Sequence, residues 1–232
     1  MNILLVISSL GSGGAERVMS LMANYWANER HRVTLVTLDK TGNDFYLLSA
    51  NVSRIGLDLL CESNHTLAAL ANNFSRTARL RKTIKEVRPD VVISFMEKTN
   101  ILTILATALL PVTTIISERT DPRFHQIGSI WTWLRNRIYQ YAYALVVQTN
   151  GVWGWASFRF RNCKIAVIPN PVVLPPSFEE ATHSQSTETT VVAIGRLDRY
   201  KGFDILINAF SQCVTDRPEW RLVILGEGPE RK

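Results

Sequence analysis

The chain has 232 residues, of which 46% are hydrophobic and 20% charged, so its composition excludes an intrinsically disordered protein. Its three cysteines form no Cys-x-x-Cys pair, which argues against a zinc site or a disulfide scaffold and favours a reducing compartment. The longest apolar run, residues 101–116, is interrupted by Pro111 and is too short to span a bilayer, and residues 1–10 lack the cationic start of a signal peptide.

A strand–helix–strand pattern opens the chain. Residues 2–8 form an apolar run typical of a buried strand, residues 15–28 carry apolar side chains at helical spacing, and residues 32–38 predict a second strand. This order predicts a parallel, doubly wound α/β sheet. The glycine loop at residues 10–14 suits a phosphate, but Glu16 stands where a dinucleotide fingerprint requires a small residue, which argues against NAD.

The same alternation continues through the middle of the chain. Strands are predicted at residues 52–57, 90–95 and 112–117, and helices at residues 67–87 and 100–109. One face of the first of these helices is strongly basic. That face is either solvated or in contact with anionic lipid, and the sequence leaves both interpretations open.

A polar loop, residues 118–122, follows the strand at residues 112–117. In α/β folds, ligands bind at the carboxyl ends of the strands, so Glu118, Arg119 and Asp121 are candidate catalytic residues. The alternative is a capped turn with a local ion pair.

The positive net charge of +6 is concentrated in residues 119–164, which contain seven Lys or Arg and one acid, whereas bases and acids balance elsewhere. The segment also holds four of the six tryptophans, within a predicted helix at residues 129–142, a strand at 144–148 and a further segment at 153–160. Cations mixed with aromatic residues suit an anionic membrane or nucleic acid. We predict that a membrane faces Trp131, Trp133, Arg135, Arg137, Trp153 and Trp155. The alternative is a helix with core aromatics and solvated cations.

A second strand–helix–strand pattern closes the chain. Strands are predicted at residues 191–194 and 221–225, with a helix at residues 201–214 between them. Arg196 and Lys201 flank the turn that leads into this helix. A helix N-terminus with two nearby cations is a suitable site for a diphosphate, although an ordinary turn with solvated cations is the alternative.

The amino-acid sequences of these motifs resemble those of a known family. The runs GRLDRYKGFDILINAF and WRLVILGEGPER resemble the opening of the second lobe of GT-B glycosyltransferases of family 4, and GGAER and IPNP are similar to loops of its first lobe. The resemblance implies a Rossmann-like lobe at residues 1–171, a linker at 172–190 and the start of a second lobe at 191–232. It also implies that the donor diphosphate contacts Gly13, Gly14, Arg196 and Lys201, and that Gly226, Glu227 and Gly228 lie beside the donor.

The family implies a retaining, metal-independent transfer from a nucleotide diphosphate sugar, expected to be UDP-linked, to a lipid-linked glycan in cell-surface polysaccharide assembly. No cofactor, metal or nucleic acid is expected, and the expected location is cytoplasmic, peripheral on the inner face of the bacterial membrane. In many relatives a histidine contacts the transferred sugar; Arg119 stands at that position here, and the nearest histidine is His125. The family's Glu-x7-Glu element has no match before Lys232, so the alternative is a truncated, inactive remnant that binds a membrane or a partner.

Overall fold

The computed structural model describes residues 1–60, 66–173, 189–215 and 217–231. The chain forms two compact units, Met1–Val172 (unit 1) and Val173–Lys232 (unit 2). Most of the predicted linker, residues 174–188, lies outside the described residues. Among the helices in the described ranges, none has the length and apolar character needed to cross a membrane.

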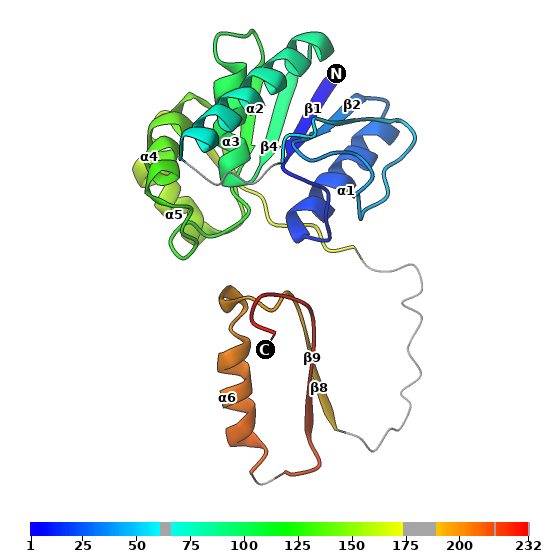
Figure 1. Ribbon diagram of the computed structural model, residues 1–232, viewed down its shortest axis with the longest axis vertical. Coiled ribbons are helices and arrows are strands. Elements are labelled where there is room, and N and C mark those ends of the chain that lie inside the picture. The colour runs from blue at the N-terminus through cyan, green and yellow to red at the C-terminus, as the bar shows by residue number, and fades with distance from the viewer. Residues whose placement is uncertain (61–65, 174–188, 216, 232) are drawn as a thin grey trace. The chain divides into compact units, whose positions relative to one another are not determined.

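Unit 1 contains a seven-stranded parallel sheet in the order β3-β2-β1-β4-β5-β6-β7. Figure 1 labels the neighbouring strands β2, β1 and β4 of this sheet. The predicted α/β class is therefore confirmed. The strands are β1 (Asn2–Ile7), β2 (Arg32–Thr37), β3 (Val52–Gly56), β4 (Val91–Phe95), β5 (Thr113–Ser117), β6 (Ala144–Val147) and β7 (Lys164–Val167).

Helices cover both faces of this sheet. They are α1 (Gly14–Asn28), α2 (Thr66–Val87), α3 (Glu97–Thr107), α4 (Ser129–Ile138) and α5 (Asn150–Arg159). Successive residues of β1 point to opposite faces, so Leu5 packs in the core that contains α1, whereas Leu4 packs with Leu80 and Ile84 of α2. Alpha helices α3, α4 and α5 share a third core with β5 and β6.

Two helix boundaries differ from the sequence-based prediction by three residues or more. Helix α3 begins at Glu97, three residues before the predicted start, directly after the carboxyl end of β4. The predicted helix at residues 129–142 is wrong at its end, because α4 stops at Ile138 and a 3₁₀ turn, Tyr139–Tyr141, follows. This turn brings the Tyr139 side chain into the core, where it is fully buried. As a result, the Tyr139 hydroxyl contacts Glu97 and Glu118, which follow the carboxyl ends of β4 and β5.

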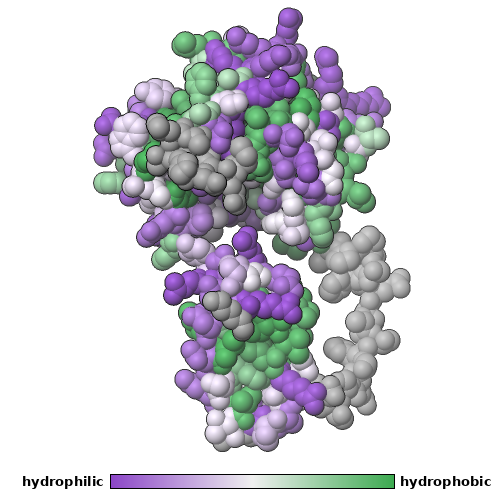
Figure 2. Space-filling model, viewed as in Figure 1, coloured by the Kyte–Doolittle hydropathy of each residue, from purple (hydrophilic) through white to green (hydrophobic). Residues whose placement is uncertain are grey.

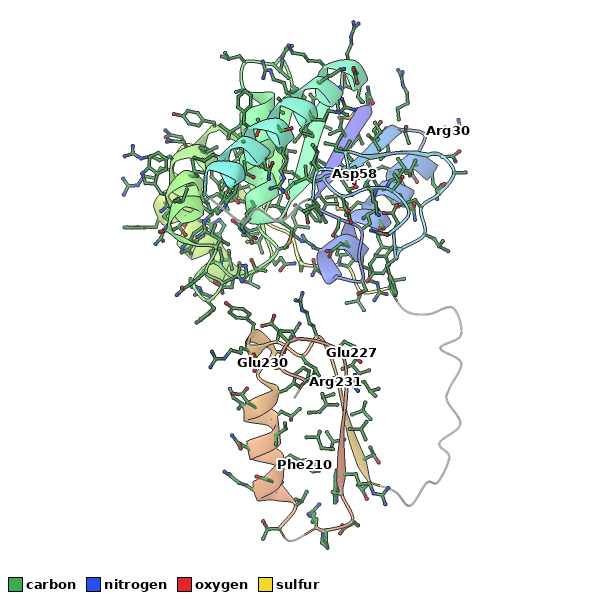
Figure 3. The ribbon with its side chains drawn as sticks, viewed as in Figure 1. Arg30, Asp58, Phe210, Glu227, Glu230 and Arg231 are labelled. Atoms are coloured by element: carbon green, nitrogen blue, oxygen red, sulfur yellow. The ribbon has the colours of Figure 1, made fainter. Side chains whose placement is uncertain are left out.

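Unit 2 contains the parallel strands β8 (Thr190–Ile194) and β9 (Arg221–Leu225), a 3₁₀ turn, Arg199–Lys201, and helix α6 (Phe203–Cys213). Phe210 projects from α6 toward the strands (Figure 3). Apolar side chains gather on the visible surface of unit 2 (Figure 2), and Val192, Ile194 and Leu225 are exposed.

Candidate functional site

The candidate site of unit 1 lies at the carboxyl edge of its sheet. Strands β1, β4, β5 and β6 are parallel neighbours, so the segments that follow them meet at one edge. The predicted glycine loop follows β1, and the predicted Glu118 and Arg119 follow β5 directly. The fold thus brings two of the predicted groups to the same edge.

The glycine loop leads directly into α1. Gly13 is the residue before the first turn of the helix, and no side chain caps the helix there. A β-carbon at Gly13 would collide with the carboxylate of Glu16, whereas Gly14 has open space around it. The carboxylate of Glu16 therefore lies close to the N-terminus of α1, where the helix dipole favours a negative charge. A side chain at position 13 would displace the Glu16 carboxylate from this place.

Glu118 is the centre of a buried polar network. Its side chain is 0% exposed; the Tyr139 hydroxyl donates a hydrogen bond of 2.7 Å to its Oε1, and Arg135 Nη1 lies 3.8 Å from the same oxygen. Asn100 Nδ2 in turn donates to the Tyr139 hydroxyl and to the backbone oxygen of Ser117. Because burial disfavours the ionised form, the pKa of Glu118 is raised to about 7, and the Tyr139 bond and Arg135 oppose this shift. This burial does not fit direct contact with substrate, so we interpret Glu118 as a positioning residue.

A second buried carboxylate, Glu97, is paired with a histidine. His125 Nε2 lies 3.2 Å from Glu97 Oε1, and the Glu97 side chain is 7% exposed while that of His125 is 33% exposed. Met96, which precedes Glu97, has a positive φ of 76°, a strained conformation for a residue with a side chain. His125 was predicted only as the histidine nearest to Arg119. Glu97 was not predicted, although an acidic side chain at the end of a buried strand is an available signal.

Arg119 lies over the ring of Phe95, with its Cζ atom 4.3 Å from the ring centroid. Its guanidinium also contacts the Asn170 side chain, and Gln148 Nε2 donates to the same Asn170 oxygen at 2.7 Å. Partial burial lowers the pKa of Arg119 to about 10, so the side chain stays cationic at neutral pH. Asn170 and Gln148, which follow β7 and β6, were not singled out from the sequence, although Asn170 belongs to the IPNP turn.

Asp121 does not join these side chains. Its carboxylate accepts hydrogen bonds from the backbone N–H of Arg123 and from the Arg123 guanidinium, which lowers the pKa of Asp121. This arrangement is the capped turn with a local ion pair that the sequence analysis named as the alternative for this loop. Of the three predicted catalytic residues, Arg119 has the geometry that best suits an anionic ligand.

The pKa of Glu118 gives a testable pH dependence. Its folded pKa, about 7, lies above the ordinary value of 4.5, so the stabilisation of the neutral carboxyl is present below about pH 4.5 and is lost as the pH rises through about 7. Glu118→Gln keeps the shape and cannot ionise. Across this window the unfolding free energy of the parent should fall by on the order of 3 kcal/mol relative to the variant. The unfolding free energy at each pH is measured by urea denaturation, with hydrogen exchange at the amides of β4 and β5 as the probe. Glu86→Gln on the surface is the control, and equal pH slopes in parent and Glu118→Gln would refute the expectation.

The predicted membrane-facing set is split by the fold. The prediction for Arg135 is wrong, because the side chain is 5% exposed, pairs with Glu118 and lies over the ring of Trp155. Trp131 and Trp155 are half-buried and pack against the core of α3, α4 and α5. Trp133, Trp153 and Arg137 are exposed and stay candidates for a surface contact.

In unit 2, the loops after β8 and β9 lie side by side. Leu197 N–H donates to Glu227 O at 2.9 Å, and Gly195 N–H donates to Leu225 O at 3.0 Å. Arg196 and Lys201 are exposed on the first loop, and Arg196 Nε is 3.9 Å from Asp198. Gly202, with a positive φ of 66°, ends the 3₁₀ turn and precedes the first residue of α6. Lys201 therefore lies two residues before α6 and Arg196 seven residues before it, and their contact with a diphosphate stays a prediction.

The Gly-x-Gly of the second loop has a packing role. A β-carbon at Gly226 would collide with the backbone oxygen of Gly195, and one at Gly228 would collide with the backbone oxygen of Leu197. Glu227 between them points away and pairs with Arg231, which lies at the same end of the unit (Figure 3). The glycines hold the two loops together and thereby help to position Arg196. Within the described residues, no group of three or more His, Cys, Asp or Glu side chains could hold a metal ion.

The chain is similar to known proteins over nearly its whole length. The sequence profile of Glycosyltransferase Family 4 matches residues 12–174, and that of Glycosyl transferases group 1 matches residues 176–232. The chain is 30% identical over 237 residues to the Campylobacter jejuni GalNAc-alpha-(1->4)-GalNAc-alpha-(1->3)-diNAcBac-PP-undecaprenol alpha-1,4-N-acetyl-D-galactosaminyltransferase, covering 100% of this chain and 63% of that protein. The chain thus spans less than two thirds of the length of this relative.

Solved structures share the fold at low sequence identity. Sucrose-phosphate synthase from Thermosynechococcus elongatus has a TM-score of 0.78 at 14% identity, with 100% of this chain and 64% of that chain covered. Anabaena HepE, solved in complex with UDP, has a TM-score of 0.65 at 17% identity, with 98% and 61% covered. These likenesses confirm the predicted GT-B fold class.

Proposed function

Because the chain belongs to glycosyltransferase family 4, we propose that it transfers a sugar from a nucleotide diphosphate sugar to a hydroxyl of a lipid-linked glycan. The relative from Campylobacter jejuni, whose name contains a diphosphate-linked undecaprenol glycan, supports this acceptor class. HepE, solved in complex with UDP, supports UDP as the nucleotide of the donor.

The observation that carries this proposal is the pair of exposed cations at the start of α6. Lys201 stands two residues before the first turn of the helix, whose N–H groups and dipole favour an anion, and Arg196 is exposed on the loop that leads to it. A diphosphate that leaves the donor gains negative charge, and these groups are placed to stabilise it. Within unit 1, we keep the backbone groups of Gly13 and Gly14, at the N-terminus of α1, as proposed contacts of a phosphate.

We propose a retaining and metal-independent reaction. The sequence contains no Asp-x-Asp, the pattern that would bridge a divalent ion to the diphosphate, and two cations are available for the same task. At the carboxyl edge of unit 1, His125 is oriented by Glu97, so it is our candidate for contact with the transferred sugar. Arg119, held by Phe95 and Asn170, is the candidate for an anionic group.

The proposed acceptor places the protein at a membrane. We propose a cytoplasmic location, peripheral on the inner face of the bacterial membrane, with Trp133, Trp153 and Arg137 among the surface residues that meet the anionic leaflet. The basic face of α2 adds to the positive charge of unit 1. We propose no nucleic acid partner, because contact with the anionic leaflet already accounts for the positive charge of unit 1.

The experiment is a transfer assay with the native protein, UDP-sugars as donors and a prenyl diphosphate-linked glycan as acceptor. We expect transfer to continue in excess EDTA and the new bond to keep the anomeric configuration of the donor, as measured by NMR of the product. Loss of turnover in EDTA that added magnesium restores would refute metal independence. An inverted anomer would refute the retaining course.

A further inference from the structure

An apolar groove runs along the surface of unit 1 between α2, α3 and α4, which are neighbours in Figure 1. Its volume is about 680 Å³, which is within the usual range of small-molecule sites. Leu70, Phe74 and Ile130 line it with exposed fractions of 64%, 78% and 67%. Leu102, Leu105 and Trp131 form much of the rest of its apolar lining. Large apolar side chains gathered at this exposure are typical of a binding surface.

A lysine lies beside one of the residues that line the groove. Lys98 Nζ lies 5.8 Å from the centroid of the Trp131 ring, and Trp131 lines the groove. Lys98 is exposed and follows Glu97, whose carboxylate contacts His125. Gly128 and Ser129, three and four residues after His125, also line the groove. A molecule lying in the groove could therefore have its polar end at Lys98 and near His125.

We propose that this groove binds the hydrocarbon chain of a prenyl diphosphate lipid, with the diphosphate at Lys98. The two halves of such a lipid match the two halves of the site, because the lining takes the apolar chain and the ammonium group takes the anionic head. This inference rests on the proposed function, since it places the lipid of the acceptor. It goes beyond that function because it assigns a binding site to the hydrocarbon chain of the lipid. Sugar transfer to the glycan does not by itself require such a site.

Calorimetric titration of farnesyl diphosphate into the chain tests the site. We expect farnesyl diphosphate to bind at least about tenfold more tightly than either inorganic diphosphate or farnesol, because only the intact amphiphile uses both halves of the site. The double variant Leu70→Ser, Ile130→Ser should weaken binding by about tenfold or more. Lys98→Ala should remove most of the advantage of farnesyl diphosphate over farnesol.

The control is Phe45→Ser, Leu47→Ser, which removes two exposed apolar side chains that do not line the groove and should leave affinity within about twofold. Near-ultraviolet circular dichroism shows whether each variant stays folded. Equal affinity in the groove variant and the parent would overturn the site. So would neutral phosphatidylcholine vesicles that bind through Leu70 and Ile130 while farnesyl diphosphate does not. Failure of this binding alongside intact sugar transfer rejects the groove alone, and intact binding without transfer rejects the proposed function.

Discussion

Replacing Lys201 by alanine should lower the turnover of sugar transfer by on the order of 10²–10³, the effect of removing one preorganised stabiliser of developing charge. Lys201 is exposed at the end of the 3₁₀ turn, one residue before the left-handed Gly202 and two before the first residue of α6. Its charge matters more as the diphosphate departs than in the intact donor, so turnover should fall more than donor affinity.

Two further variants separate this role from a simple surface charge. Arg196→Lys should retain only part of the parent's activity, because a planar guanidinium that can bind two oxygens is replaced by a single ammonium group. Lys85→Ala, on the exposed basic face of α2, is a control that should change turnover by less than about threefold. Turnover of Lys201→Ala within a few-fold of the parent would show that the cation merely solvates a turn. Steady-state kinetics with varied donor concentration measures all three variants.

Gly226→Ala should destabilise unit 2 by about 3 kcal/mol, because the added methyl group would overlap the backbone oxygen of Gly195. The two loops cannot separate without loss of the bonds from Gly195 N–H to Leu225 O and from Leu197 N–H to Glu227 O. Hydrogen exchange at the amides of β9, compared between parent and variant, measures the change.

The matched control for Gly226 is Gly14→Ala, because a β-carbon at Gly14 meets no atom within 4 Å. That change should leave the exchange of β9 unaltered, since Gly14 lies in unit 1. Unchanged protection of β9 in Gly226→Ala would show that the glycine serves only the donor and not the packing of the loops. Loss of protection supports a packing role, through which the Gly-x-Gly positions Arg196.

Most strands of the sheet could be predicted from the sequence because of where they lie in the fold. Central parallel strands are buried on both faces, so β1 and β4 appear as near-continuous apolar runs. Cations next to a glycine turn and a helix start were equally readable, because the local order Gly195, Arg196, Lys201 sets their neighbourhood. In both cases the information lies within a few residues along the chain.

The network around Glu118 was not readable in this way, because its partners are 17 and 21 residues away in sequence, at Arg135 and Tyr139. Only the packing of α4 and the turn that follows it brings them to the end of β5. One signal did exist. Arg135 is four residues after Trp131 and three before Ile138, a helical spacing that places it on the buried face with them. Trp133 and Arg137 share the opposite, exposed face at the same spacing.

The most direct measurement is the transfer of radiolabelled sugar from a UDP-sugar into butanol-extractable lipid by the native protein, with the parent and Lys201→Ala side by side. We predict that label enters the lipid fraction with the parent, in the presence of EDTA, and falls by about two orders of magnitude or more with the variant. Label that stays in the aqueous phase with every UDP-sugar and prenyl diphosphate acceptor tried, while the folded parent also fails to bind UDP, would contradict the proposed function.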